Sequence, residues 1–336
     1  TYQTSVDQYF QKHDCLPSPP VMHAILPASD TAMADNDKND PTGILVVGDV
    51  HGCLEELQQL HDVAVEKYNE GRPLAHVILV GDLVNKGPHS LGVIRHVRQQ
   101  QERKQVDGAK EKHSQWWCVR GNHDNAALLA AVGDESRRQK ETYQWIWGNS
   151  TNGIVSEKDA VSDADVEWLS NLPYTLRIPQ EAFPSSRNDG NKENHGDYMI
   201  VHAGFVPGVP LEEQSITDMV NLRTVASDKE ATTIDEPNAW MAPASNDDNR
   251  EQHPWASIWA GPDHVVFGHD ARRGLQIAPR YATGLDTGVV YGKELTGLLL
   301  HSPSSPSFKR TLVQVPAVAE HCRVVGKKAK KKTQES

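Results

Sequence analysis

The sequence predicts an α/β fold, in which short buried strands alternate with amphipathic helices. Apolar runs at 44–47, 77–80 and 116–119 are each followed within two residues by a Gly-Asp or Gly-Asn pair, which is typical of a buried strand that ends in a turn. After the first run, apolar side chains recur at spacings of three and four residues over 53–69, as on one face of a helix. In such folds ligands bind beyond the carboxyl ends of the strands, so the polar residues after these runs are the first candidates for a functional site.

The rest of the chain continues this alternation. The pattern predicts helices over 89–101 and 125–132, and a mostly helical stretch over 134–172. Further strands are expected at the apolar runs that follow. They are 174–178, 198–201 and 265–267, and then 281–286, 296–301 and 311–315, the last three as strands of a second sheet.

The chain of 336 residues is long enough for one large domain with a sizeable core. Residues 1–42 lack periodicity and predict an N-terminal extension, while 43–318 should form the folded catalytic domain. Within that domain, stretches near 183–197 and 227–254 are rich in polar residues and predict exposed insertions. The Lys-rich end, 319–336, is expected to be a basic, disordered tail.

Overall charge and cysteine content narrow the class of protein. The formal net charge is −11, so the chain as a whole should repel polyanions, and binding one needs a local basic patch. The four cysteines form no CxxC pair, which favours a reducing compartment, either the cytoplasm or the nucleus. No apolar stretch reaches the roughly 20 residues of a membrane span, so no membrane partner is expected.

Five short blocks, each with a carboxylate, amide or imidazole ligand beside a glycine, occur in order along the chain. Taken alone, a Gly-Asp pair is usually a turn and a buried histidine is usually structural. Five blocks in one order, most of them after apolar runs, instead indicate one site assembled at the ends of several strands. The blocks are GDVHG at 48–52, GDLVNKG at 81–87, GNHD at 121–124, HAG at 202–204 and GHD at 268–270.

The residue types in these blocks suit a pair of transition-metal ions. Asp49 and His51 stand two residues apart, so both side chains can point the same way, and Asp82 has two oxygens with which it can bridge two ions. Mixed carboxylate and imidazole ligands favour Mn, Fe, Zn or Co over Ca. Two such ions about 3.5–4 Å apart lower the pKa of a shared water to about 7 and clamp phosphoryl oxygens. The other candidate ligands are Asn122, His202 and His269, and the adjoining His123 is placed to donate a proton to the leaving oxygen.

In this order, the blocks resemble those of the phosphoprotein-phosphatase superfamily of calcineurin-like metallophosphoesterases. Protein Ser/Thr phosphatases of that superfamily carry GDxVDRG and GNHE, whereas this chain has Asn85, Lys86 and Asp124 at the differing positions. Those residues, together with GLDTGVVYG at 284–292, look like the ApaH-like phosphatases, relatives of the bacterial diadenosine tetraphosphatases. The resemblance covers roughly 44–301. It implies a four-layer α/β/β/α sandwich of two mixed sheets flanked by helices.

The resemblance also implies how the ligands are shared between two divalent metal ions. Asp49 and His51 would hold the first ion together with Asp82, which would bridge to the second. The second ion would be completed by Asn122, His202 and His269.

Residues beside the ligands take their implied roles from the same resemblance. His123 would be the general acid, with Asn85 and Asp124 as its catalytic neighbours. Lys86 stands where the phosphatases have a phosphate-binding arginine. The other implied phosphate-binding residues are Arg223 and Arg120, of which Arg120 is either structural or in contact with phosphate.

Asn85 bears on the kind of bond that the site cleaves. In the protein phosphatases the aspartate at this position pairs with the general-acid histidine, and such a charge typically raises a pKa by about 1–3 units. Asn85 can accept the same hydrogen bond from His123 but brings no charge, so His123 should hold its proton less tightly. A phosphate that leaves from an anhydride is a weak base and needs little help from an acid. We therefore expect phosphoanhydrides to be favoured over phosphoesters.

These observations predict an enzyme that hydrolyses phosphoanhydride bonds by attack of a metal-activated water. Three substrate classes stay open: dinucleoside polyphosphates, inorganic polyphosphate and capped RNA, so nucleic acid is expected only as a substrate. The alternatives are a protein Ser/Thr phosphatase and a non-catalytic scaffold on a phosphatase fold. Four tryptophans near the blocks would either stack on nucleobases or belong to the core: Trp145, Trp147, Trp255 and Trp259.

Overall fold

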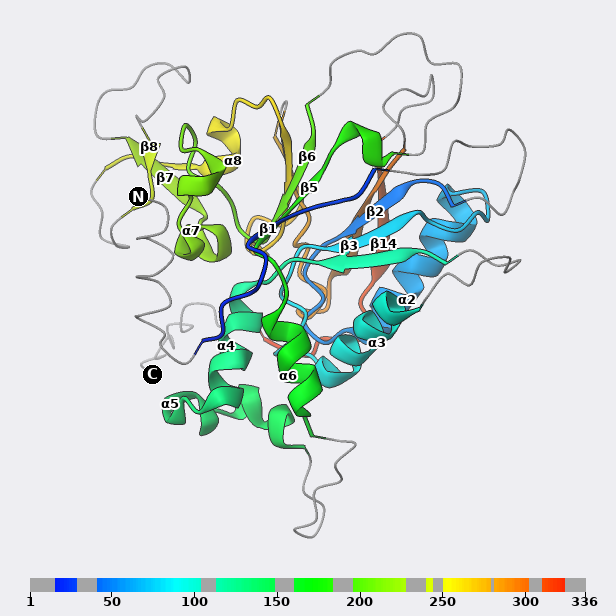
Figure 1. The fold of residues 1–336 in the computed structure, drawn as a ribbon, viewed down its shortest axis with the longest axis vertical. Helices are drawn as coiled ribbons and strands as arrows, with labels where there is room; N and C mark the ends of the chain where they lie inside the picture. Colours follow the sequence, from blue (N-terminus) through cyan, green and yellow to red (C-terminus); the bar gives the residue numbers. More distant parts are fainter. Residues whose placement is uncertain are drawn as a thin grey trace, which may run out of the picture.

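The computed structural model describes nine stretches of the chain, which carry two large sheets, one small sheet and the helices that cover them (Figure 1). Most of the two predicted polar insertions, and the predicted tail beyond residue 323, lie outside the described residues. No helix in the described part of the chain is long and apolar enough to cross a membrane. The described stretches are 16–28, 41–103, 113–148, 160–183, 196–227, 240–243, 250–278, 281–301 and 310–323.

The five-stranded sheet contains the strands that the first three apolar runs predicted. Strands β2 (Ile44–Val47), β3 (His76–Leu79) and β4 (Gln115–Cys118) pair in parallel, so their carboxyl ends meet at one edge. Strand β13 (Glu294–Leu300) joins β2 in antiparallel orientation, and β14 (Arg310–Pro316) lies outside it.

A six-stranded sheet packs against the first one. Its strands β6 and β10 pair in parallel, so the histidine blocks that follow them also lie at one edge. We expected residues 281–286 to share a second sheet with the last two strands. This prediction is wrong, because β12 pairs with β10 whereas β13 and β14 extend the five-stranded sheet. The order of strands is β1 (His23–Ile25), β5 (Thr175–Ile178), β6 (Tyr198–Val201), β10 (His264–Phe267), β12 (Ala282–Gly284) and β11 (Gln276–Ile277).

The predicted polar loop at 227–254 contains a small third sheet instead. Strand β7 (Thr224–Ser227) pairs with β8 (Trp240–Met241) on one side and with β9 (Gln252–Pro254) on the other. The sheet is visible beside α7 in Figure 1. The predicted insertion therefore contains paired strands and is not only a loop.

Helices cover the outer faces of the two large sheets, as the predicted four-layer sandwich requires. Helices α2 and α3 flank the five-stranded sheet in Figure 1, whereas α7 and α8 lie at the opposite side of the molecule. Helix α4 begins at Asn122, three residues earlier than predicted, which places the GNHD block in its first turn. The helices are α2 (Leu54–Val63) with its π-helical continuation (Ala64–Tyr68), α3 (Ser90–Glu102), α4 (Asn122–Val132), α5 (Glu135–Arg138), α6 (Asp163–Ser170), α7 (Ile216–Asn221) and α8 (Trp255–Ile258), with 3₁₀ turns at Glu141–Trp147, Gln180–Ala182 and Leu211–Glu213.

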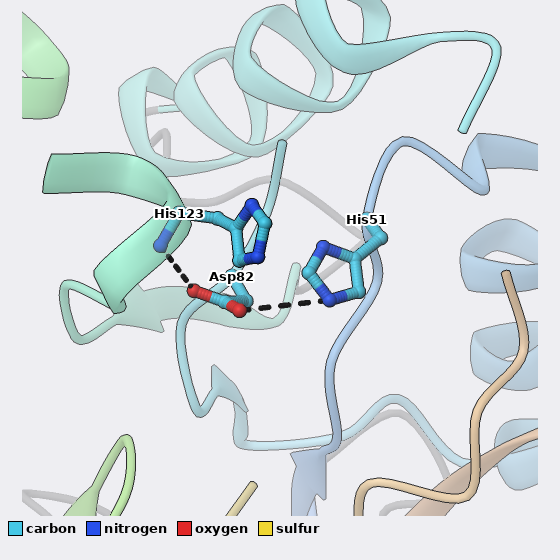
Figure 2. Close-up of side chains that lie close together, drawn as sticks. All are labelled: His51, Asp82 and His123. Carbon is cyan, nitrogen blue, oxygen red and sulfur yellow. Dashed lines mark hydrogen bonds and ion pairs between the residues drawn. The ribbon is translucent and has the colours of Figure 1, made fainter. Parts of the chain in front are cut away.

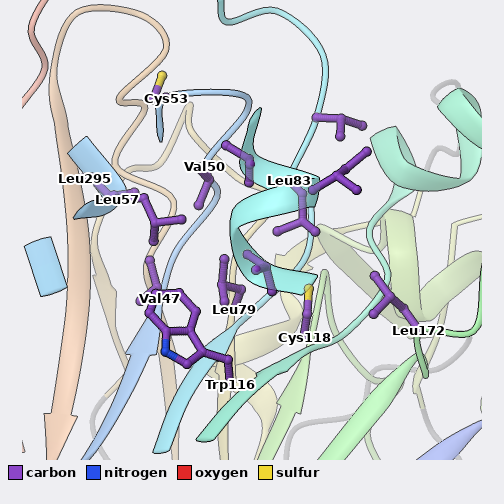
Figure 3. Close-up of a cluster of buried hydrophobic side chains, with 14 of the residues drawn as sticks. Val47, Val50, Cys53, Leu57, Leu79, Leu83, Trp116, Cys118, Leu172 and Leu295 are labelled. Atoms are coloured by element: carbon purple, nitrogen blue, oxygen red, sulfur yellow. The ribbon is translucent and has the colours of Figure 1, made fainter. Parts of the chain in front are cut away.

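The alternation of side chains along β2 explains the layers. Leu45 and Val47 point to the helices, where they pack in the cluster that Figure 3 shows, whereas Ile44 and Val46 point to the six-stranded sheet. A strand whose two faces are both buried has a continuous apolar sequence, and residues 44–47 have such a sequence. Cys53 belongs to the helix-side cluster, so it packs as a small apolar side chain.

Both ends of the described chain are held against the domain. Strand β1 lies inside the predicted N-terminal extension, yet it pairs with β5 in the six-stranded sheet. At the other end, the backbone N–H of Val318 donates to Glu56 Oε1 at 2.9 Å, and that of Cys322 donates to Val290 O at 3.0 Å. The predicted disorder of the tail therefore does not begin at residue 319, and the proposed domain limits stay predictions.

Candidate dinuclear metal site

The carboxyl ends of four strands and the first turn of α4 bring the six predicted ligands into one cluster. All but Asn122 are buried, so their polar atoms must be satisfied by one another, by backbone or by a bound group. The ligands are Asp49 and His51 after β2, Asp82 after β3, Asn122 at the start of α4, His202 after β6 and His269 after β10.

The first group of ligands surrounds one nitrogen of His51. Its Nε2 lies 3.5 Å from Asp82 Oδ2 and 3.9 Å from Asp49 Oδ2. Figure 2 shows the ring directed at Asp82, with His123 on the other side of that carboxylate. Lys86 Nζ also approaches the same nitrogen, at 2.9 Å. The three predicted ligands of the first ion are thus within reach of a single cation.

The second group shares Asp82 with the first. His202 Nε2 lies 3.3 Å from Asp82 Oδ1 and 3.0 Å from Asn122 Oδ1. His269 Nδ1 lies 3.0 Å from the same amide oxygen. The two oxygens of Asp82 therefore face the two groups separately, as a bridging ligand requires.

The opposite nitrogens of the three histidines fix the position of the proton on each ring. His51 Nδ1 lies 3.0 Å from Val84 O and His202 Nδ1 lies 3.0 Å from Val80 O, while His269 Nε2 lies 3.1 Å from Asn221 O. A carbonyl oxygen can only accept, so each of these nitrogens carries the hydrogen. The nitrogen that faces the cluster therefore presents a lone pair, as in histidines that bind metals.

This set of donors fits a pair of divalent transition-metal ions. The unprotonated nitrogens of His202 and His269 both face the side-chain amide of Asn122, and that of His202 also lies 3.3 Å from Asp82 Oδ1. A lone pair that faces a carboxylate oxygen is repelled by it unless a cation lies between the two. The mixture of imidazole, carboxylate and amide groups suits Mn, Fe, Zn or Co.

The pKa values of the buried ligands support the same conclusion. Burial lowers the pKa of all three imidazoles, and the nearby ammonium of Lys86 lowers that of His51 further. The rings are therefore neutral at physiological pH, which is the form that binds metal. Burial also raises the pKa of the Asp49 carboxyl, and repulsion from Asp286 and Asp82 raises it further. The carboxylates of Asp49, Asp82 and Asp286 repel one another at this separation, so a positive charge among them would stabilise their ionised forms.

The backbone of the site is strained. Among the described residues, six that are not glycine have a positive φ, and five of these belong to the candidate site. A left-handed conformation in a residue with a side chain costs about 1–3 kcal/mol and persists only where its surroundings enforce it. The five are His51, Asp82, Asn85, Lys86 and His269, with φ between 47° and 71°.

Two glycines of the blocks allow the ligands to approach the backbone. A Cβ atom on Gly268 would overlap Asp49 Oδ1, and one on Gly121 would overlap Asp82 Oδ1. Backbone N–H groups use the space: His269 N donates to Asp49 Oδ1 at 3.1 Å and His123 N donates to Asp82 Oδ1 at 2.8 Å. The glycines are therefore part of the ligand geometry.

His123 lies at the site, but Asn85 contacts it differently from our expectation. Trp145 Nε1 donates to Asn85 Oδ1 at 2.9 Å, and Asn85 Nδ2 donates to His123 O at 3.0 Å while facing His123 Nδ1 at 3.3 Å. The prediction that Asn85 accepts a hydrogen bond from His123 is therefore wrong, because its amide nitrogen faces the ring. Burial lowers the pKa of His123 to about 4.

Asp124 organises the loop that carries Asp82 rather than the reacting groups. Its carboxylate accepts from the backbone N–H groups of Gly121, Asp82 and Leu83, at 2.8, 2.9 and 3.0 Å. It does not line the cleft described below. Asp124 thus positions a ligand, which corrects the catalytic role predicted for it.

Arg120 lies away from the cleft in the described structure, so of the two roles left open for it the structure supports the structural one and not the contact with phosphate. The side chain is fully buried. Its guanidinium donates to Pro17 O at 3.1 Å and to Tyr174 Oη at 3.2 Å, and it also contacts Ser170 O. Arg120 therefore ties α6 and the N-terminal segment to the end of β4.

We expect Arg120→Leu to lower the free energy of unfolding by about 3 kcal/mol, because several buried acceptors lose their donor. The KM of the enzyme should change by less than about twofold, since the side chain does not reach the cleft. Arg223→Leu is the matched control: that side chain is half exposed in the cleft, so it should raise KM and leave stability almost unchanged. Denaturant unfolding and steady-state kinetics of both variants check this. A raised KM in Arg120→Leu at unchanged stability would contradict the structural role.

A cleft of about 1260 Å³ opens over the predicted ligands. His51, Asp82, Asn122, His123 and His269 form part of its lining. Asp286, which the GLDTG segment carries and to which sequence reasoning gave no role, also lines it. Its basic lining residues are Lys86, Arg223, Arg272, Arg273 and Lys293, and among the described lining residues Tyr291 is the one aromatic side chain other than histidine.

The tryptophans near the blocks pack in the interior instead of lining the cleft. Trp255 is almost fully buried, with its ring centroid 4.8 Å from that of Phe267 and 6.2 Å from that of Trp259. Trp145 and Trp147 pack against the helix-side core cluster. The described lining therefore favours the core alternative over base stacking for these residues.

Comparisons with known proteins agree with this site. Residues 42–276 match the family model of the calcineurin-like phosphoesterases. A zinc-dependent endopolyphosphatase of Saccharomyces cerevisiae is 26% identical over 84% of this chain and 82% of its own. A symmetrical bis(5'-nucleosyl)-tetraphosphatase of a Janthinobacterium species is 25% identical over 80% of this chain and 94% of its own. A solved structure described provisionally as a diadenosine tetraphosphatase has a TM-score of 0.56 at 27% identity, covering 88% of this chain and 98% of that one. The chain therefore belongs to the calcineurin-like metallophosphoesterases.

Proposed function

We propose that this protein hydrolyses phosphoanhydride bonds with two divalent metal ions, and that inorganic polyphosphate is its preferred substrate class. The observation that carries the choice of substrate is the lining of the cleft, where five basic side chains accompany a single tyrosine. A polyphosphate needs positive charge along its path and no base pocket. The relatives named as an endopolyphosphatase and a tetraphosphatase support the cleavage of anhydrides.

When bound, the two ions would supply a water of lowered pKa and would polarise the phosphoryl group under attack. The ligand types allow Mn, Fe, Zn or Co, and the zinc-dependent relative supports zinc. One ion would be held by Asp49, His51 and Asp82, and the other by Asp82, Asn122, His202 and His269.

Lys86 and Arg223 are placed to hold the reacting phosphoryl group. The ammonium of Lys86 lies beside His51 and 5.5 Å from the centroid of the Tyr291 ring. Arg223 Nη2 donates to His269 O at 3.1 Å and Nε lies 3.9 Å from Asp270 Oδ1, so the half-exposed guanidinium is held beside the predicted ligands, where it could reach a phosphoryl oxygen. His123 would direct a ring nitrogen at the leaving oxygen, within the same cleft.

Basic residues away from the ligands would hold the rest of an extended polyanion. Arg272 and Lys293 are exposed and line the cleft, and Arg273 forms an ion pair with Asp270 there. The same lining also carries Asp218, Asp270 and Asp286, so the positive charge available to a substrate here comes from the exposed Arg272 and Lys293. Charge of this kind increases the capture of an anionic substrate.

A dinucleoside polyphosphate is the second candidate substrate, and Tyr291 is the observation that favours it. The ring lines the cleft beside Lys86 and could stack on one base, an interaction worth about 1–3 kcal/mol. The relative named as a tetraphosphatase supports this candidate as well. A single aromatic side chain provides for one base and leaves the second without a partner among the described residues.

A substrate panel tests the proposal. Long polyphosphate, tripolyphosphate, diadenosine tetraphosphate, capped RNA and a phosphoserine peptide are compared, each with Mn, Zn and Co. Arg272→Ala should raise the KM for long polyphosphate by about tenfold and that for tripolyphosphate much less, because only the long chain extends beyond the metal site. Arg138→Ala, on the exposed α5, is the matched control and should change neither value.

Three outcomes would contradict the proposal. A preference for the phosphoserine peptide would indicate a protein phosphatase. A preference for diadenosine tetraphosphate that Tyr291→Ala abolishes would establish the second candidate. No turnover with any metal would indicate a scaffold.

The cytoplasm or the nucleus is the compartment that we propose for this activity. The described cysteines Cys53, Cys118 and Cys322 all carry free thiols. Burial raises the pKa of the Cys53 thiol to about 12, so this group is held as an unreactive thiol. Free thiols fit a reducing environment.

A further inference from the structure

We infer that Trp145 is a positioning residue that determines, through Asn85, which nitrogen of His123 carries hydrogen. No block of the sequence contains Trp145, which lies 60 residues beyond Asn85. The inference deepens the proposed function and rests on it, because its consequence is whether His123 can donate a hydrogen bond to the leaving oxygen.

The indole of Trp145 fixes the orientation of the Asn85 amide. An indole N–H can only donate, so the atom 2.9 Å from Trp145 Nε1 must be the amide oxygen of Asn85. The other end of the amide lies 3.0 Å from His123 O, which can only accept, so that atom must be the amide nitrogen. The two contacts agree, and the flipped amide would lose both hydrogen bonds. Without the indole it would lose only the bond to His123 O, and it could accept from a His123 Nδ1–H instead.

The oriented amide then determines the state of the imidazole. Asn85 Nδ2 faces His123 Nδ1 at 3.3 Å, and an NH₂ group offers hydrogens and no lone pair. His123 Nδ1 must therefore accept, which leaves the hydrogen on Nε2. In the opposite tautomer, two N–H groups would face each other.

The surroundings keep Asn85 from turning away. Its side chain is fully buried, and its backbone has a left-handed φ of 70°. Its backbone N–H donates to Ser90 Oγ at 2.9 Å. Trp145 belongs to the 3₁₀ turn Glu141–Trp147, which the buried side chains of Tyr143 and Ile146 fix to the core.

The resulting imidazole presents an N–H group to the leaving oxygen. Hydrogen on Nε2 can stabilise a developing oxyanion by a hydrogen bond. In the opposite tautomer Nε2 would present a lone pair, which repels an oxyanion. Trp145 and Asn85 together thus hold His123 in the tautomer that can assist departure of the leaving group.

The tautomer can be observed directly by NMR of the full chain labelled with ¹⁵N-histidine, before and after zinc is added. Long-range ¹H–¹⁵N correlations separate the two tautomers, and His123→Gln identifies the resonances of interest. We expect hydrogen on Nε2 of His123 in the wild type and a shift toward Nδ1 in Trp145→Phe, which keeps the ring and removes the N–H. Trp147→Phe, in the same turn and packed against the same core, is the matched control and should leave His123 unchanged.

Kinetics test the consequence for turnover. Trp145→Phe should lower kcat on tripolyphosphate by about tenfold, with KM nearly unchanged. Asn85→Asp presents an oxygen to His123 Nδ1 and should lower kcat in the same way, so it serves as an independent test if Trp145→Phe does not fold. Adding Trp145→Phe to Asn85→Asp should change little, since a carboxylate presents an oxygen in either orientation.

Two results would overturn the inference. One is hydrogen on Nδ1 of His123 in the wild type. The other is a loss of kcat in Trp145→Phe that persists undiminished in the Asn85→Asp background, because a purely structural role predicts it. If the wild type cleaved no phosphoanhydride, the proposed function would fail, while the NMR spectra would still decide the role of Trp145.

Discussion

Asp82→Asn should lower kcat/KM by about 10³-fold or more, because the stabilisation that metal ions give the transition state is worth several kcal/mol. Asp82 is the one ligand whose two oxygens face both groups, 3.5 Å from His51 Nε2 and 3.3 Å from His202 Nε2. An amide of the same shape keeps an oxygen for one group and loses the charge that both ions share. The bound metal should therefore fall from two ions per chain to one or fewer.

Metal analysis by mass spectrometry, alongside kinetics, checks this expectation. Asp218→Asn is the matched control, since Asp218 lines the same cleft but belongs to neither ligand group. It should retain two ions and most of the activity. Two ions in Asp82→Asn, with activity within tenfold of the wild type, would show that the bridging assignment is incorrect.

Gly268→Ala should abolish activity through a single methyl group, with kcat/KM reduced by about 100-fold or more. The new Cβ would overlap Asp49 Oδ1 and lie 2.8 Å from Val80 Cγ2, so the carboxylate must leave its position. Unlike His269 beside it, Gly268 has no left-handed φ, so alanine is compatible with the backbone there. The loss therefore measures the contact with the ligand and not a strained turn.

Gly92→Ala separates this effect from a general intolerance of glycine replacement. Gly92 lies within α3, and its Cβ would meet the flexible end of Leu54 at 3.1 Å. Alanine is favoured over glycine in a helix by about 1 kcal/mol, so this variant should be at least as stable as the wild type and fully active. Full activity in Gly268→Ala would mean that Asp49 is dispensable.

The clustering of the six predicted ligands could be predicted from sequence, because each of them lies at the end or the start of an element that the local pattern indicates. Asp49 and Asp82 lie within two residues of an apolar run, and parallel pairing then brings the runs together. The sheet to which β12 belongs could not be predicted in this way. Packing between segments that are distant in sequence determines that β12 pairs with β10, and the apolar run itself does not indicate its partner strand.

The roles of Arg120 and Asp124 could not be predicted, for a different reason. Arg120 precedes the GNHD block and Asp124 ends it, and in sequence a buried arginine looks the same as one that binds phosphate. Their partners decide the role, and the backbone acceptors of Arg120 lie 50 or more residues away, at Ser170 and Pro17. Asn85 likewise accepts a hydrogen bond from Trp145, 60 residues further along the chain, and no residue near Asn85 in the sequence indicates that contact.

The left-handed backbone at five positions of the site also predicts which substitutions would accumulate if variants were selected for thermal stability alone. Glycine would adopt these φ values without steric cost. It would release about 1–3 kcal/mol of strain at each position, against a loss of roughly 0.5–1 kcal/mol from the greater freedom of the unfolded chain. A library ranked by melting temperature would therefore enrich variants that have exchanged Asp82 or His269 for glycine. Such variants would be robust and inert, so engineering of this enzyme must score turnover at every round.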